Sequence, residues 1–315
     1  GISDPRAVDQ ARAGLAEAEG TGDQNLIGRM ELALGAAIRN SSVDFAEPLK
    51  HLSEGRRLLE AHPEPYWWDP TWEQGLLQLT IAMYLPPSDD RKREHFERAI
   101  ELLDEAGDVV LHSAALSETV ELWGVAEDEW VMDNAHRAVQ LFDSLDVPYW
   151  SGHSRVLHGV MLIRRGELGE AVRNFELAAG ELIDLGDINC WAKSLGLIAS
   201  CRIELDQLDA AGAQLLDVIE QMDHLPRAQS HQFRVLDRAA ALLYRRGEPE
   251  LAAALLGAGS RIPERASIIP STADRIGVEA GLNELLGHER TAELIDAGRD
   301  LDFAAASRLF VPLLR

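Results

Sequence analysis

The chain has 315 residues, of which 46% are hydrophobic and 26% are charged, a composition typical of a folded protein rather than a disordered one. Its 53 acidic residues outnumber the 30 basic ones and give a formal net charge of −23. Because phosphate contacts dominate affinity for nucleic acids, this charge argues against direct binding of DNA or RNA, and equally against an anionic membrane surface. No apolar run approaches the ~20 residues needed to cross a bilayer, and the opening residues lack the pattern of a signal peptide.

Taken in chain order, the sequence predicts helices throughout. Asp4 and Pro5 suit an N-cap and a first helical position, so a first helix is expected at about 5–19. Helix pairs are then expected at about 24–61, 69–106, 109–146, 150–186, 188–224 and 228–262. Three shorter helices follow the segment "IPERASIIPST". The predicted organisation is a helical repeat array over residues 1–265 and capping helices over residues 266–315.

A short sequence motif, which we call the recurring phrase, supports this organisation because it returns every 40 to 41 residues. "GVAEDEWV", "RRGELGEA", "ELDQLDAA" and "RRGEPELA" begin at Gly124, Arg164, Glu204 and Arg245. A fixed period of this size is typical of stacked helix pairs, with the phrase at the turn inside each pair. No β-type alternation is present, so the fold class is predicted to be all-α. A terminal cap is expected because the last repeat would otherwise expose its apolar face.

Local signals agree with these boundaries. The second helices carry apolar residues at the same offsets, as in Ala171, Phe175, Ala178 and Leu182, which form one stripe of an amphipathic helix. Gly–Asp pairs at 107–108 and 186–187 predict a C-cap glycine followed by an aspartate N-cap. The arginine doublets at 164–165 and 245–246 fall in the last turns of first helices, where cations offset the helix dipole, and we interpret them as structural.

The fourth pair resembles a tetratricopeptide repeat. Gly159 matches the small residue of that repeat's first helix, Gly166 its turn glycine, and Ala171 and Ala178 its small residues in the second helix. Gly247 and Ala252 repeat two of these matches. The resemblance implies a right-handed α-α superhelical solenoid that binds a protein or peptide on the face of its first helices. The period of about 40 departs from the usual 34 of that family.

The C-terminal segment resembles the end of large bacterial, mostly actinobacterial, signal-transduction ATPases. The matching features are "ALLGA" at Ala254–Ala258, a proline-containing joint, and a helix with the pattern G-x-E…A near 287–292. Those proteins carry LuxR-type, AfsR/SARP-type or adenylate cyclase output domains. The resemblance implies a cytoplasmic regulatory arm whose partners include its own parent ATPase. Because the first residue is Gly1 rather than methionine, we expect a piece of a larger protein.

The sequence offers no recognisable catalytic chemistry. It contains no HExxH, G-x-S-x-G or G-x-G-x-x-G motif and no P-loop, since glycine is never followed by lysine. Cys190 and Cys201, eleven residues apart on one helix, would lie ~16 Å apart and cannot form a disulfide. His153 and His158 point in different directions around their helix and do not converge on a metal. We therefore predict a protein that is not an enzyme, with no catalytic residue, cofactor or metal site.

The repeat register predicts which residues face a ligand. Placing each first helix on the tetratricopeptide pattern gives a candidate concave face of Ser113, Trp123, His153, Val156, Lys193, Ser200, Arg234, Asp237 and Tyr244. The alternative is a purely structural role, in which most of these residues pack between helices or face solvent. The aromatic run "PYWWDPTW" at 65–72 is either a partner anchor or a stiff connection between repeats.

Three functions remain open at this point. The favoured one is a protein- or peptide-binding regulatory domain of a larger signalling ATPase or transcriptional regulator. The alternatives are a free-standing scaffold or adaptor, and a sensor that closes around a small effector. An enclosed apolar pocket would favour the small effector, because small ligands are held in such pockets.

Overall fold

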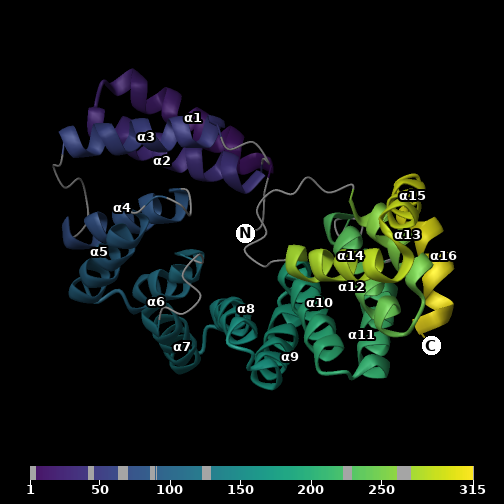
Figure 1. Ribbon diagram of the computed structural model, residues 1–315. Helices are drawn as coiled ribbons and strands as arrows, with labels where there is room; N and C mark the ends of the chain where they lie inside the picture. Colours follow the sequence, from purple (N-terminus) through teal and green to yellow (C-terminus); the bar gives the residue numbers. More distant parts are fainter. Residues whose placement is uncertain are drawn as a thin grey trace. The chain divides into compact units, whose positions relative to one another are not determined.

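The structure is a computed structural model, and it describes residues 5–41, 46–62, 70–85, 89, 91–122, 129–222, 229–260 and 271–314 (Figure 1). Over these ranges the protein is all-α and contains no strand, which confirms the predicted fold class. None of the helices in these ranges is long and apolar enough to cross a membrane. The chain divides into two compact units, 1–125 with 133–141, and 126–132 with 142–315.

The first unit begins with three helices that pack one on the next. Helix α1 packs on α2 around Leu15, Leu34 and Ile38, and α2 packs on α3. Two further helices, α4 and α5, form the next antiparallel pair. The bounds are α1 Pro5–Thr21, α2 Gln24–Ser41, α3 Ala46–Ala61, α4 Pro70–Tyr84, α5 Arg91–Glu105, α6 Val109–Glu118 and a 3₁₀ helix η1 Thr119–Leu122. The aromatic run at 65–72 lies largely outside the described residues, but Trp72 donates its Nε1–H to Asp108 at 2.7 Å.

The second unit contains the repeats with the recurring phrase. Helices α8 and α9, α10 and α11, and α12 and α13 form successive pairs, and each pair lies beside the next (Figure 1). These bounds agree with the pairs predicted from the sequence. They are α8 Pro148–Arg164, α9 Leu168–Asp184, α10 Ile188–Glu204, α11 Leu208–Met222, α12 Gln229–Arg245, α13 Pro249–Gly259, α14 Ser271–Leu286, α15 His288–Gly298 and α16 Phe303–Leu314. Helix α7, Glu129–Ser144, contributes residues to both units.

The predicted Gly–Asp turns are confirmed. Gly107 and Gly186 have φ of 72° and 73°, in the left-handed region that favours glycine. The following aspartates cap the next helices, because the side chain of Asp108 accepts from the N–H of Leu111 and that of Asp187 from the N–H of Cys190. Local sequence chemistry therefore sets these two helix boundaries.

The fourth pair shows how the repeat packs. The predicted stripe of α9, Ala171, Phe175, Ala178 and Leu182, is completely buried. A methyl group placed on Gly159 of α8 would lie 2.5 Å from Cε1 of Phe175. This distance is far below van der Waals contact, so only glycine lets the ring of α9 approach the backbone of α8. The small residue expected from the tetratricopeptide resemblance has this packing role.

The C-terminal helices pack against the end of the array. Helix α15 packs on α13, α14 contacts α12 and α13, and α16 contacts α11, α12 and α13. A methyl group on Gly257 would lie 2.0 Å from the carbonyl oxygen of Ile295, and one on Gly298 would lie 2.0 Å from that of Ala254. The glycine of the "ALLGA" motif therefore lets α15 touch the backbone of α13. The boundary proposed at residue 265 remains a prediction.

Candidate binding face

Successive first helices of the second unit are joined by side-chain contacts. His153 of α8 has its Nδ1 3.9 Å from Sγ of Cys190 in α10. The Nε–H of Arg238 in α12 donates to Oγ of Ser200 in α10 at 3.1 Å. Arg275 of α14 donates from Nη1 to Oδ1 of Asp237 in α12 at 2.9 Å. The row α8, α10, α12 and α14 therefore presents one side of each helix to its neighbour. The predicted face residues of α8, α10 and α12 lie on these helices, whereas Ser113 lies in α6 of the first unit.

The predicted face residues differ in burial. His153, Lys193, Ser200 and Tyr244 are half-buried, and Asp237 is 9% exposed. Ser113 and Val156 are completely buried, and Ser113 donates its hydroxyl to the carbonyl of Val109. Trp123 lies outside the described residues. Arg234 lies in α12, but its side chain is not among those that the structure describes. The half-buried members are the ones that a ligand can reach.

Arg238 is a functional candidate that the sequence analysis missed. One and two repeats earlier the same position is Leu197 and Leu157, each 2% exposed. Arg238 is only 6% exposed, so a guanidinium occupies a place where the array otherwise buries leucine. The fold makes room for it, since a methyl group on Gly196 would lie 3.0 Å from its Cζ. Aligning the repeats position by position would have identified Arg238, because the equivalent residues of the two preceding repeats are leucines.

Arg238 belongs to a set of polar side chains that we call the arginine cluster: Ser200, Asp237, Arg238 and Arg275. Besides the bonds above, Arg275 donates from Nη2 to the carbonyl of Leu256 in α13 at 2.7 Å. The cluster contains two guanidinium groups and one carboxylate, so its own charge is positive in a chain that is strongly acidic overall. Lys193 lies two turns before Ser200 on the same side of α10 and adds a further cation. Guanidinium groups are suited to binding carboxylates, because their N–H donors match both oxygens.

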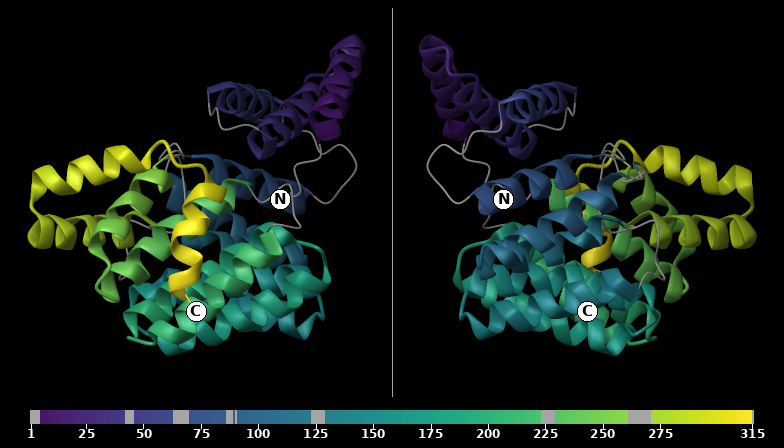
Figure 2. Two further views of the ribbon diagram at one scale, coloured as in Figure 1. Left: turned by 90° about the vertical axis from the view of Figure 1, so that its right-hand side faces the viewer. Right: turned by 90° about the vertical axis from the view of Figure 1, so that its left-hand side faces the viewer.

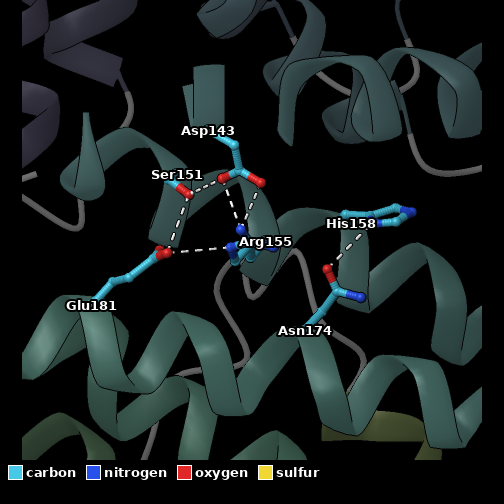
Figure 3. A network of polar contacts seen from close by, with 6 residues as sticks. All are labelled: Asp143, Ser151, Arg155, His158, Asn174 and Glu181. Atoms are coloured by element: carbon cyan, nitrogen blue, oxygen red, sulfur yellow. Dashed lines mark hydrogen bonds and ion pairs between the residues drawn. The ribbon is translucent and has the colours of Figure 1, made fainter. Parts of the chain in front are cut away.

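A second polar region joins α7, α8 and α9 (Figure 3). We call it the polar seam, and it consists of Asp143, Ser151, Arg155, His158, Asn174 and Glu181. Arg155 donates from Nη2 to both carboxylate oxygens of Asp143 at 2.7 Å, and its Nε lies 3.4 Å from Oε1 of Glu181. Ser151 donates its hydroxyl to Asp143 at 2.7 Å. Desolvation raises the pKa of Glu181, against the smaller opposing effect of Arg155. The two carboxylates thus share one cation.

The rest of the seam lies further along the same two helices. His158 of α8 has Nδ1 3.3 Å from Oδ1 of Asn174 in α9 (Figure 3), and Asn174 donates to the carbonyl of Glu170. In the following repeats the position of Arg155 is Leu195 and Leu236, and that of His158 is Ile198 and Ala239, all buried. The fourth pair therefore packs through polar groups where the next two pairs use apolar ones.

Across the part of the chain that the structure describes, no three His, Cys, Asp or Glu side chains are arranged to hold a metal ion. Neither Cys190 nor Cys201 forms a disulfide, and their side chains are half-buried and buried respectively.

Comparisons with known proteins give evidence on the fold. No protein-family model matches the chain, and no curated protein does. Among solved structures, aspartyl phosphate phosphatase F from Bacillus subtilis is similar, with a TM-score of 0.59 at 11% identity. The match covers 90% of this chain and 74% of that one. At this identity the likeness shows the helical-repeat fold alone.

Proposed function

We propose that this chain is a non-catalytic, tetratricopeptide-like domain that binds a protein or peptide through the face of α8, α10 and α12. The ligand presents a carboxylate to the half-buried groups of the arginine cluster, Ser200 and Arg275, and to Lys193, while the buried Arg238 donates to Ser200. The observation that carries this proposal is Arg238, a buried cation at a position where neighbouring repeats place leucine. Burying a guanidinium costs free energy that a leucine would not cost, which supports a role for Arg238 other than packing.

The half-buried residues extend the same face. His153 on α8 and Lys193 on α10 occupy the same register position in successive repeats, and Arg234 on α12 follows them. A row of cationic or titratable side chains at this spacing suits an extended peptide or a helix with more than one carboxylate. Electrostatic attraction of this kind increases the rate of association and selects the partner.

We further propose that binding regulates a larger bacterial signalling ATPase or transcriptional regulator. The C-terminal resemblance supports this context, and the chain itself contains no phosphate-binding loop. A ligand can shift the parent protein only if it binds the two states of the array with different affinity. A free-standing adaptor and a small-effector sensor remain the alternatives.

The decisive experiment compares capture of partners from host lysate by four forms of the chain. Arg238→Leu removes the buried cation and restores the residue type of the other repeats. We expect this variant to keep its fold, and circular dichroism checks its helical content. A His153/Lys193/Arg234 triple-alanine variant removes the three residues that share one register position in successive repeats. Arg173→Ala is the control, because Arg173 is an exposed arginine of α9 that pairs with Glu170. We expect one partner that wild type and the control retain and both test variants lose.

Each other outcome has a definite meaning. Equal capture by all four forms would refute the proposed face. No partner in any form, together with heat stabilisation by a small molecule from a lysate extract, would favour the effector sensor. Release of inorganic phosphate from a phospho-aspartyl protein by the purified chain would refute the non-catalytic assignment, and the fold likeness to a phosphatase makes this assay necessary.

A further inference from the structure

The outer side of helix α9 is apolar at positions where the neighbouring second helices are polar. Leu177 and Ile183 are 54% and 38% exposed, and Gly180 lies between them in the same helix. We call these three residues the outer strip. By the 40-residue period, the equivalent residues are Arg137, Gln140 and Asp143 one repeat earlier and Asp217, Glu220 and Asp223 one repeat later.

Gly180 has no packing role within the part of the chain that the structure describes. Nothing lies within 4 Å of the place where its side chain would begin, whereas a methyl group on Gly159 would clash with Phe175. Glycine also weakens a helix interior compared with the glutamine or glutamate found at this position in α7 and α11. A glycine that faces open space is explained if another molecule approaches the backbone of α9 there.

The outer strip is not covered by the described part of the chain. Helix α9 packs on α8 and α10 through its opposite side, where Phe175 and Leu182 are completely buried. Helices α14 and α15 (yellow) lie apart from α9 (teal) in Figure 1 and in both views of Figure 2. Single exposed apolar residues are common, but two that flank a glycine at helical spacing form a surface that a partner helix can contact closely.

The surroundings of the outer strip are acidic. Arg202 of α10 joins α9 to α11, because it donates to Glu176 of α9 at 2.9 Å and to Gln214 of α11 at 3.1 Å. On α11, the carboxylates of Asp217 and Glu220 are exposed. The whole chain has a net charge of −23, so it attracts a partner rich in lysine and arginine and repels a second copy of itself.

We propose that the outer strip is a docking site for a basic amphipathic helix of a partner protein. An apolar side chain of that helix packs over Gly180, between Leu177 and Ile183. Lysine or arginine residues at the edges of the partner helix face Asp184, which is exposed at the end of α9, and Asp217 of α11. Helix α9 is not one of the helices of the candidate binding face, so this site does not depend on the function proposed for that face.

The test uses the full chain and two fluorescent amphipathic helical peptides, one made of leucine and lysine and the other of leucine and glutamate. We expect wild type to bind the leucine–lysine peptide at least about tenfold more tightly than the leucine–glutamate peptide. A graft variant gives α9 the residues of α11 through Leu177→Asp, Gly180→Glu and Ile183→Asp. Because the graft adds negative charge, attraction alone would strengthen binding of the leucine–lysine peptide. A loss of at least about tenfold, which we expect, therefore reports the apolar contact.

Further variants separate the apolar contribution from the charged one. Leu285→Asp, at an exposed leucine of α14, is the matched control and should bind like wild type. Asp184→Asn combined with Asp217→Asn should weaken binding and reduce its dependence on salt. Circular dichroism checks helical content, and Leu177→Asp alone replaces the graft if the graft loses helix.

Four results would overturn the proposal. The first is that wild type does not bind the leucine–lysine peptide, and the second is that the graft binds it as tightly as wild type. The third is equal binding of the two peptides. The fourth is a wild-type dimer in sedimentation that the graft dissociates, because the occupant would then be a second copy of the chain.

Discussion

Replacing Gly257 by alanine tests the contact between the backbones of α13 and α15. The new methyl group would begin 2.0 Å from the carbonyl oxygen of Ile295, and ordinary contact starts at 3.4 Å. The obstacle is backbone, which cannot rotate away as a side chain can. Helix α15 must therefore move outward, and the packing around Gly298 must open with it.

The magnitude follows from two opposing effects. Alanine favours the helix by about 0.8–1 kcal/mol relative to glycine. Overpacking in a close contact costs about 1–3 kcal/mol, and a contact with backbone is expected at the upper end. The net loss in the free energy of unfolding is therefore about 2 kcal/mol, which lowers the melting temperature of a unit of this size by roughly 4–8 °C.

Gly277→Ala is the matched control in the same region. Gly277 lies in α14, and nothing lies within 4 Å of the position of its new methyl group. Only the helix propensity then applies, so this variant should be stabilised by up to about 1 kcal/mol. Thermal unfolding followed by circular dichroism measures both variants. Similar effects of the two substitutions, or a Gly257→Ala variant as stable as wild type, would refute the assigned packing of the "ALLGA" motif.

Three further predictions concern the repeats. Gly159→Ala should destabilise by about 1–2 kcal/mol through its clash with Phe175, whereas Gly180→Ala, with open space around it, should stabilise; urea unfolding separates the two signs. Burial raises the pKa of Glu181, so its charged form reduces stability at neutral pH, and this loss disappears as the pH falls through the raised pKa. Glu181→Gln should therefore stabilise the protein at neutral pH and do so less near pH 4.5, as measured by melting temperature against pH; a constant gain would contradict the shift. Asp187→Ala removes the cap of α10 and should cost about 1 kcal/mol, with faster amide exchange at Cys190; unchanged exchange there would contradict the capping role.

Much of the fold could be predicted from the sequence because its signals are local. The recurring phrase, the apolar stripe of α9 and the Gly–Asp turns depend on residues within one helix pair or one turn. The 3.6-residue period indicates which side of each helix is buried, and the 40-residue period predicts the same buried side in each successive helix pair. The helix bounds and the packing role of Gly159 follow from such patterns.

The candidate site was predictable only in part. The register placed His153, Lys193 and Ser200 where they are half-buried, but it also selected Val156, which is completely buried. A helix face defined by register cannot distinguish a position that meets solvent from one that meets the next helix. Arg238 was not selected because its register position is a core position, and an isolated arginine in a sequence gives no sign of its burial.

The sequence by itself therefore determined the class of fold, the helix pairs and their buried stripes, because residues a few positions apart decide them. Only the tertiary structure decided which polar groups meet. Arg238 and Ser200 are 38 positions apart, and Arg246 and Leu313 are 67 positions apart. The physical reason is that such contacts depend on how one helix lies on the next, to within about an ångström. Positions such as Gly196 and Gly212, whose lack of a side chain leaves room for Arg238 and for the end of α16, set that arrangement.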